Sequence, residues 1–276
     1  MTNNQIPYPR HGIAGYYSVV DLPQRDPLGA APFSTGWAEL DQILKIYPEQ
    51  FIVTTGMAGS GKSTFLFNLI TNLCWVHQKK AWMYIPENER RILPKLEKIF
   101  GDQPNGSLFG RFVHTQCFVQ SSDYVHYNDE PRTIEWILER AYWAWEKDKI
   151  DLVLIDPWNE LERARDKDEN LTDYIGRCLM RVKMFARQTG CTMFMVAHPT
   201  KAAVGRDVLL ADIEGSMNWF NKCDNGLVIR REAKETLVIS AKVREQPEAG
   251  APGDCRFLVD AVTGRFNEQP GGGQIF

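Results

Sequence analysis

Residues 51–63 read FIVTTGMAGSGKS and join a β-rich run, 51–55, to a glycine-rich loop. The loop, 56–63, fits the pattern GxxxxGK(S/T) of a P-loop, and an amphipathic stretch begins at Thr64. Its glycines let the backbone turn so that successive N–H groups point at a polyphosphate, and the dipole of a following helix adds to the attraction. The alternative is a flexible glycine turn, but a strand before the loop and a helix after it favour nucleotide binding.

The P-loop pattern assigns roles to particular side chains. Lys62 is expected to reach the β- and γ-phosphates of a nucleotide, and Ser63 to hold Mg²⁺. The predicted nucleotide-binding residues of the loop are Gly56, Gly59, Ser60, Gly61, Lys62, Ser63 and Thr64.

The composition limits the class of protein. With 276 residues, 43% of them hydrophobic, the chain suits one α/β domain with an extension. No run approaches the roughly 20 apolar residues of a membrane span, and the polar start lacks a signal-peptide core, so we expect a soluble, intracellular protein. Six cysteines without CxxC spacing argue against a zinc ribbon and a disulfide scaffold. The net charge of −3 gives no bulk attraction to nucleic acid, so any such contact must come from a local cluster or from copies arranged in a ring.

Three segments are expected along the chain: an arm at 1–33, one domain at 34–268 and a flexible tail at 269–276. From Thr35 onward, β-like runs alternate with helical periodicity, which is typical of a parallel sheet flanked by helices. One helix is expected to start at Pro131 and another to end at Gly190. The predicted core strands are 51–55, 81–85, 112–119, 152–155 and 192–197, and an antiparallel extension is predicted at 226–229, 236–243 and 256–259.

Two acidic residues follow predicted strands, at the sheet edge where open α/β sheets bind their ligands. Asp156 ends the apolar run 152–156 in the Walker B arrangement, where it would hold the Mg²⁺ shell. Glu87 follows the strand AWMYI and could orient and deprotonate an attacking water. The alternatives are a turn-starting aspartate before proline and a first-turn glutamate that favours a helix dipole.

Three further polar residues lie in or directly after predicted strands. His198 ends the strand TMFMVA and could sense a γ-phosphate by hydrogen bonding, although an isolated loop histidine is the alternative. Lys242 and Arg244 alternate on a late strand and are expected to point to the same face. Taken alone, such a pair is most simply a solvated face.

Taken together, these segments resemble the RecA-like motor domain of DnaB-type replicative helicases. The resemblance covers about 34–268 and is nearest to the Twinkle and phage primase-helicase branch, which carries histidine at the position matched by His198. The segments that carry it, in chain order, are STGWAELD (34–41), the P-loop, YIPEN (84–88), IDPWNELE (155–162), VAHPTK (196–201), DIEGSMNWFNKCDNG (212–226) and KVR (242–244).

The resemblance implies a role for each of these residues. Glu87 would be the catalytic base, and His198 would couple the γ-phosphate to a strand-binding loop, 201–215. Arg244 would be an arginine finger and Lys242 its companion, both reaching the nucleotide of a neighbouring subunit. Lys201 and Arg206 would contact single-stranded DNA, unless they belong to an ordinary charged loop. Together with Lys62, the predicted catalytic residues are Glu87, His198 and Arg244.

The sequence therefore favours an ATP- and Mg²⁺-dependent motor on single-stranded DNA that forms a ring, expected to be hexameric, and moves 5′ to 3′ as its relatives do. Relatives usually carry a primase, zinc-binding or other large N-terminal domain, whereas a short arm precedes this motor. A separate primase or loader is a further candidate partner. A rival is a RecA-like accessory ATPase that binds single strands or a partner protein without unwinding. A third reading, a nucleotide-binding regulatory module without turnover, is weakened by Glu87.

Overall fold

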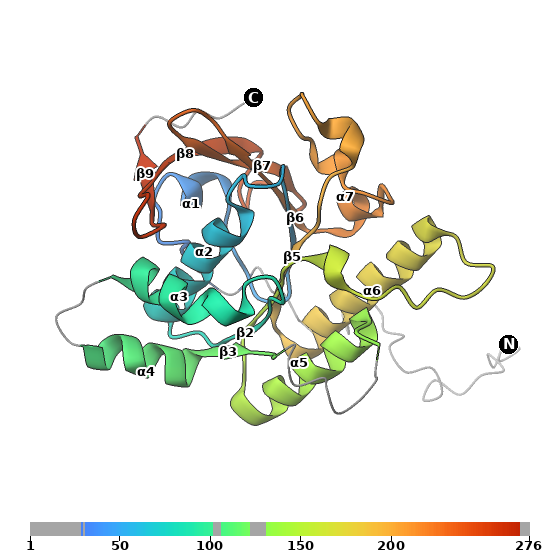
Figure 1. The fold of residues 1–276 in the computed structure, drawn as a ribbon, viewed down its shortest axis with the longest axis horizontal. Helices are drawn as coiled ribbons and strands as arrows, with labels where there is room; N and C mark the ends of the chain where they lie inside the picture. The colour runs from blue at the N-terminus through green and yellow to red at the C-terminus, as the bar shows by residue number, and fades with distance from the viewer. Residues whose placement is uncertain (1–28, 30, 102–105, 122–130, 271–276) are drawn as a thin grey trace, which may run out of the picture.

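The computed structural model describes residues 29, 31–101, 106–121 and 131–270. The strands are β1 (Phe51–Thr55), β2 (Ala81–Tyr84), β3 (Cys117–Val119), β4 (Leu152–Ile155), β5 (Thr192–Val196), β6 (Asn225–Arg231), β7 (Thr236–Val243), β8 (Gly253–Val259) and β9 (Phe266–Gln269). Within the described residues, these nine strands form one sheet in the order β3–β2–β4–β5–β1–β6–β7–β8–β9. The first six in this order are parallel, and β7, β8 and β9 continue antiparallel (Figure 1). The predicted fold class is confirmed.

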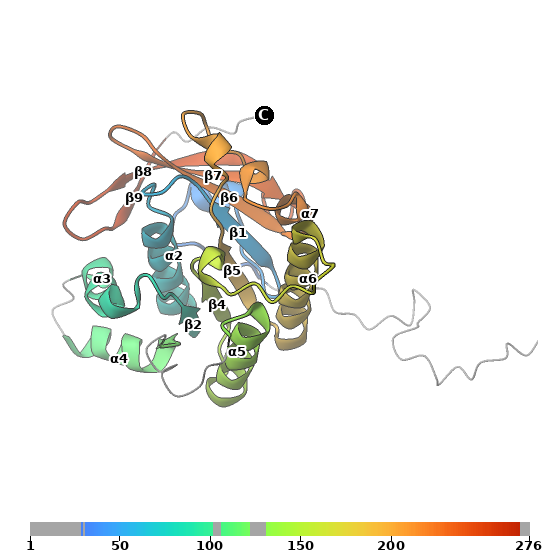
Figure 2. The same cartoon turned by 45° about the vertical axis from the view of Figure 1, so that its right-hand side comes forward.

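Two helical layers cover the sheet. The main helices are α1 (Leu40–Ile43), α2 (Lys62–His77), α3 (Ile92–Phe100), α4 (Gly106–Gln116), α5 (Ile134–Asp148), α6 (Leu171–Thr189) and α7 (Asn218–Lys222). Figure 2 shows α2, α3 and α4 on one side of the parallel strands, with α5 and α6 on the other. Successive residues of β1 point to opposite helical layers. Ile52 packs in the core with α2, whereas Phe51 and Val53 pack in the core with α5 and α6. Strands buried on both faces read as continuous apolar runs, which is why the sequence located them.

The predicted strand at 112–119 is wrong over its first part. Residues 112–116 are the last part of α4, and only Cys117–Val119 form a strand, paired with β2. Phe109, Phe112 and Val113 follow one another at helical spacing and pack against the core beneath α3. Phe112 stacks on Phe100 with ring centroids 5.1 Å apart. In 112–119, FVHTQCFV, three polar residues separate two apolar pairs and Cys117, so neither period is decisive, and burial of Phe112 against Phe100 favours the helix.

One of the two predicted helix boundaries is confirmed and the other is wrong. Gly190 ends α6 in the left-handed conformation, φ 78°, as predicted. Pro131 is not the first residue of α5, since the helix begins at Ile134 with Thr133 as its N-cap. The Thr133 hydroxyl accepts a hydrogen bond from the Trp136 N–H at 3.3 Å, so a side-chain cap rather than a proline sets the start.

An aromatic cluster fixes the antiparallel extension to the helical layer. Phe266 of β9 packs edge-on against Phe65 of α2 and Phe257 of β8, and its carbonyl accepts a hydrogen bond from the Trp37 indole at 3.0 Å. β9 was not predicted, and its last residue, Gln269, is the first residue of the predicted tail.

Residues 1–28 and 30 of the predicted arm, and 271–276 of the predicted tail, lie outside the described residues. All six cysteines are free thiols, and five of them are buried. None of the helices in the described ranges combines the length and the apolar composition that a membrane crossing needs.

Candidate nucleotide site

Four adjacent parallel strands bring Lys62, Glu87, Asp156 and His198 to one edge of the sheet, whereas Arg244 of the predicted catalytic set lies elsewhere. The strands β2, β4, β5 and β1 are neighbours in that order. Glu87 follows β2, Asp156 follows β4, His198 follows β5, and the P-loop follows β1. Because the carboxyl ends of parallel strands meet at one edge, groups that are far apart in sequence converge there.

The backbone of the P-loop requires its glycines. Gly56, Gly59 and Gly61 have φ values of 146°, 76° and 96°, in a region that residues with a side chain rarely adopt. A Cβ on Gly56 would lie 2.2 Å from the Ile229 carbonyl oxygen and 2.8 Å from the Ser60 hydroxyl oxygen. The first glycine therefore permits close approach of β6, and the other two permit the turn into α2.

Lys62 is buried within the curve of this loop. Its ammonium group donates hydrogen bonds to the carbonyl oxygens of Gly56 at 2.8 Å and Met57 at 3.0 Å. Burial lowers the pKa of Lys62, and the charges of Asp156 and Glu87 oppose that shift. An ammonium group has three donors, so a phosphate in the loop could accept the third.

Asp156 is almost fully buried directly after β4. Burial raises its pKa to about 6, against the effects of a hydrogen bond from the Ser63 hydroxyl and of the Lys62 charge. Its Oδ2 atom is buried and, within the described residues, has no hydrogen-bond partner. A buried carboxylate oxygen without a partner is costly, and an oxygen-seeking cation would satisfy it.

Ser63 and Asp156 therefore fit Mg²⁺. Within the described residues no three His, Cys, Asp or Glu side chains gather into a metal cluster. Mg²⁺ is commonly bound by only one or two protein groups together with substrate phosphates and water, so this small donor set suits it.

Glu87 and His198 lie within electrostatic range of Lys62. Glu87 is exposed in the turn after β2, and its charge raises the pKa values of Lys62, Asp156 and His198. His198 is half-buried, and burial followed by the Lys62 charge lowers its pKa. This shift favours the neutral imidazole, which carries one N–H donor.

The backbone of His198 connects the site to the loop that follows. Its N–H donates to the Asn159 side-chain oxygen at 3.0 Å, and its carbonyl accepts from the Glu214 N–H at 3.0 Å. Glu214 belongs to the loop 201–215 that was predicted to hold a DNA strand.

Two residues at this edge were missed in the sequence. Asn159 holds the His198 backbone, and Lys95 of α3 donates to the Asn88 side chain beside Glu87 and acts on the pKa of Asp156. Asn159 lies in the Walker B segment and could have been found there. Lys95 had no local signal, because a lysine on an amphipathic helix is most simply solvated.

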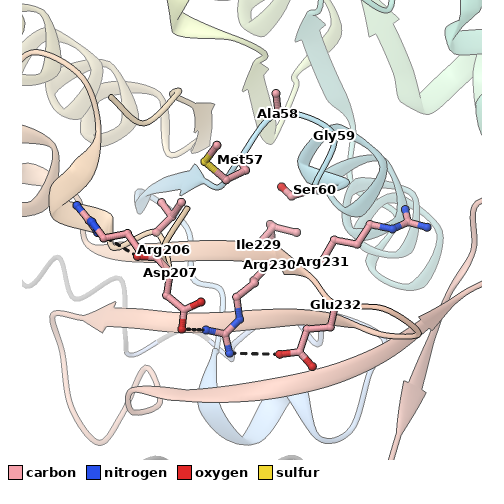
Figure 3. A pocket seen from close by; sticks show the side chains of 11 residues that line it. Met57, Ala58, Gly59, Ser60, Arg206, Asp207, Ile229, Arg230, Arg231 and Glu232 are labelled. Carbon is pink, nitrogen blue, oxygen red and sulfur yellow. Dashed lines mark hydrogen bonds and ion pairs between the residues drawn. The ribbon is translucent and has the colours of Figure 1, made fainter. Parts of the chain in front are cut away.

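A pocket of about 590 Å³ opens beside the P-loop (Figure 3). Its walls come from the P-loop at 57–60, the loop at 206–208 and the end of β6 at 229–232. Arg230 forms ion pairs with Asp207 and, at 3.4 Å, with Glu232 across this pocket. The volume suits the nucleoside part of a nucleotide whose phosphates lie in the loop. The arginines at 230 and 231 were not predicted, because only the fold brings β6 to the P-loop.

The two predicted DNA contacts differ in their surroundings. Lys201 is exposed at the start of the loop. Arg206 forms a two-pronged pair with Asp212 at 2.6 and 2.7 Å, and this pair lowers the pKa of Asp212. Asp212 therefore already neutralises the charge of Arg206, whereas no carboxylate pairs with Lys201 within the described residues.

Lys242 and Arg244 lie near the amino ends of the parallel strands, opposite the nucleotide site. We call the side of the sheet formed by these amino ends the amino edge, and the side that bears the P-loop the carboxyl edge. Asn225 at the start of β6 pairs with Val243, and β6 is parallel to β1, so Arg244 lies near the amino end of β1. The five residues of β1 place that end about 16 Å from the P-loop. The structure therefore keeps these two cations apart from the nucleotide site of their own chain.

Comparisons with known proteins agree with this architecture. A family model described as AAA domain matches residues 39–204. The Twinkle homolog protein, chloroplastic/mitochondrial, of Arabidopsis thaliana is 28% identical over 265 residues, which cover 86% of this chain and 36% of that protein. The chain thus spans about a third of the length of that relative.

Two solved structures share the fold. One, described as an ATPase domain, has a TM-score of 0.71 and 16% identity, covering 87% of this chain and 92% of that one. A DnaB-like replicative helicase, described with its primase interactions, has a TM-score of 0.70 and 16% identity, covering 86% of this chain and 63% of that one. The chain belongs to the AAA domain family of P-loop ATPases, and it has the RecA-like motor fold of the DnaB and Twinkle type.

Proposed function

We propose that the chain is the motor of an ATP-dependent, ring-forming translocase or helicase that acts on single-stranded DNA in replication. The observation that carries this proposal is the division of charged groups between the two sheet edges. Lys62, Asp156, Glu87 and His198 meet at the carboxyl edge, while Arg244 is fixed at the amino edge. A site divided in this way is completed by a second copy of the chain.

The residues of the carboxyl edge have distinct proposed tasks. Lys62 directs its charge at the transferring phosphoryl group, and Glu87 accepts the proton of the attacking water. Ser63 and Asp156 hold Mg²⁺, which when bound would neutralise negative charge on the phosphates. His198 donates its N–H toward the γ-phosphate, and its backbone bond to Glu214 connects that contact to the strand-binding loop.

The amino edge supplies the proposed second half of the site. In a head-to-tail ring, each subunit presents a different surface to its two neighbours, so one edge can meet the other. Arg244, with Lys242 beside it, would reach the nucleotide held by the next P-loop. We propose a hexameric ring, 5′ to 3′ movement, and a separate primase or loader as a partner, since a helicase with this fold is described with its primase interactions.

A second candidate function is an accessory ATPase that binds single strands or a partner protein without unwinding. The pairing of Arg206 with Asp212 favours it, because Lys201 is then the one cation of the described loop 201–215 whose charge no carboxylate neutralises.

Strand displacement and ATP hydrolysis, measured on the same preparation, test the proposal. The parent protein is expected to displace a strand from forked DNA and to hydrolyse ATP faster with single-stranded DNA. Lys62→Ala should lose both activities, because the charge directed at the phosphoryl group is gone. DNA-stimulated hydrolysis without displacement, at every protein concentration, would favour the accessory ATPase.

Glu87→Gln separates nucleotide binding from turnover. The variant should bind ATP like the parent but hydrolyse it roughly 10² to 10⁴ times more slowly, the scale for loss of a positioned general base. Glu97→Gln, an exposed change on the neighbouring helix α3, is the matched control and should keep parental turnover. Saturated Glu87→Gln protein that hydrolyses ATP at the parental rate would show that Glu87 has no part in the chemistry.

Asp156→Asn is expected to stabilise the nucleotide-free protein while removing Mg²⁺-dependent turnover. The folded pKa of about 6 lies above the ordinary value, so the unfolded chain ionises first and the parent loses stability as the pH rises from about 4 to 6. An asparagine does not titrate. The free energy of unfolding of the variant should therefore exceed that of the parent by an amount that grows through this window to roughly 2–3 kcal/mol. Urea unfolding of both proteins at several pH values measures this, and parallel pH profiles would contradict it.

Mixing two inactive variants tests the shared site, in which one subunit supplies the P-loop and its neighbour supplies Arg244. Arg244→Ala should cost about 10³ to 10⁵ in turnover, although its own P-loop is intact. Adding Lys62→Ala protein should restore activity, because about a quarter of the interfaces in a random 1:1 ring pair a working P-loop with a working arginine. Arg256→Ala, which removes a partly exposed arginine of β8, should need no such rescue. A mixture no more active than its components would refute the shared site.

A further inference from the structure

We infer that Asp224 is the positioning residue of Arg244, and that it forms with the C-terminal carbonyl groups of α7 a rigid holder for this arginine. The inference rests on the proposed function, in which Arg244 completes the site of a neighbouring subunit. It concerns residues at the amino edge of the sheet, outside the nucleotide site itself.

The holder contacts Arg244 through both its side chain and its backbone. The guanidinium Nε lies 2.9 Å from the Asp224 carboxylate, and Nη2 donates to the carbonyl oxygens of Asn221 at 2.9 Å and Cys223 at 3.1 Å. The Arg244 N–H also donates to the Asp224 carbonyl at 2.9 Å. The carbonyl groups at a helix C-terminus carry partial negative charge, so they attract a cation without ionising.

Asp224 is itself fixed from two sides. Its Oδ2 atom accepts the Phe51 N–H at 3.0 Å, at the first residue of β1, and its Oδ1 atom pairs with Lys183 of α6 at 2.6 Å. The carboxylate is only 15% exposed, whereas the Arg244 side chain is 39% exposed. An anchored anion beneath a partly exposed cation fixes the direction of the guanidinium and leaves it accessible.

The balance of charges around Asp224 allows Arg244 to exchange its contacts in the holder for contacts with another anion. Lys183, Lys242 and Arg244 surround the single carboxylate of Asp224, and Lys242 donates to the Cys223 carbonyl at 2.9 Å. One carboxylate cannot neutralise three cations, so this cluster keeps a net positive charge. A polyphosphate presented by a neighbour would therefore be attracted to the cluster, and Arg244 can exchange carbonyl contacts for phosphate oxygens.

The place of α7 is set by the loop that leads back to His198. Trp219 of α7 is fully buried against Trp158, with ring centroids 5.3 Å apart, and its indole donates to the Glu214 carbonyl at 3.2 Å. The Glu214 N–H in turn donates to the His198 carbonyl. The holder is thus built on the rigid strand β1 on one side and on the strand-binding loop on the other.

The test places Asp224→Asn in either member of the rescue mixture. In this mixture, Lys62→Ala subunits supply the arginine and Arg244→Ala subunits supply the P-loop. In the arginine-supplying subunit, Asp224→Asn should lower the restored kcat at least tenfold and leave the KM for ATP within about twofold, since positioning errors of about 1 Å can cost on the order of 10²-fold. In the P-loop-supplying subunit, the same substitution should leave the restored activity unchanged, because Arg244 is already absent there.

The asymmetry controls for folding, because the contacts of residue 224 with Phe51 and Lys183 change alike in both placements. Asparagine keeps an oxygen that can accept the Phe51 N–H. Asp224→Glu in the arginine-supplying subunit should restore more activity than Asp224→Asn, since it keeps the charge.

Each other outcome overturns the inference. Equal losses in both placements would make Asp224 a structural residue only, and no loss in the arginine-supplying subunit would mean that Arg244 needs no holder. If the mixture of Lys62→Ala and Arg244→Ala is inactive without any change at Asp224, the shared site itself fails, which distinguishes that failure from the failure of the holder.

Discussion

The buried strand β1 is the constraint on which the rest of the structure depends. All five of its residues are buried, and parallel ladders to β5 and β6 fix its register. One end continues into Gly56, where the absence of a side chain lets the Ile229 carbonyl approach, and the other end binds Asp224 through the Phe51 N–H. A strand held on both sides cannot slip without moving its side chains to the wrong face. The separation between the P-loop and the holder of Arg244 is therefore constant.

Burial at the carboxyl edge shifts two opposite charges in opposite ways. It lowers the pKa of Lys62 and raises that of Asp156, so both groups favour their neutral forms more than they would in water. Each partly compensates the other, but an Asp156 oxygen has no hydrogen-bond partner among the described residues. Such an arrangement costs folding free energy and is typical of a site built for a charged ligand. The exposed Glu87, by contrast, keeps contact with the solvent that would supply a water.

The loop 201–215, proposed to bind DNA, contacts residues at both ends of the parallel strands. Residues 206–208 line the pocket beside the P-loop, and the Glu214 backbone joins His198 to the buried Trp219 of α7. The helix α7 then ends at the carbonyl groups that hold Arg244 and Lys242. In the proposed ring, this loop would contact DNA and the nucleotide of its own subunit, and through α7 it would help to position Arg244 for the nucleotide of the neighbour.

The sequence by itself determined the parallel core and most of the carboxyl edge, because apolar runs on doubly buried strands and the glycine pattern of a P-loop are local signals. It placed Asp156, Glu87 and His198 shortly after strands and Lys62 in the P-loop, where they are found. It did not separate helix from strand at 112–116, where the decision came from the packing of Phe112 on Phe100. It also missed β9, whose polar residues are held by a ladder to β8 and by the Phe266 cluster. Only the tertiary structure decided that Arg244 lies beyond the reach of its own P-loop and that Asp212 forms an ion pair with Arg206. It also decided that Asp224 binds both the Phe51 N–H and Arg244. These contacts join residues distant in sequence, and no local periodicity encodes a pairing that exists only after the sheet has formed.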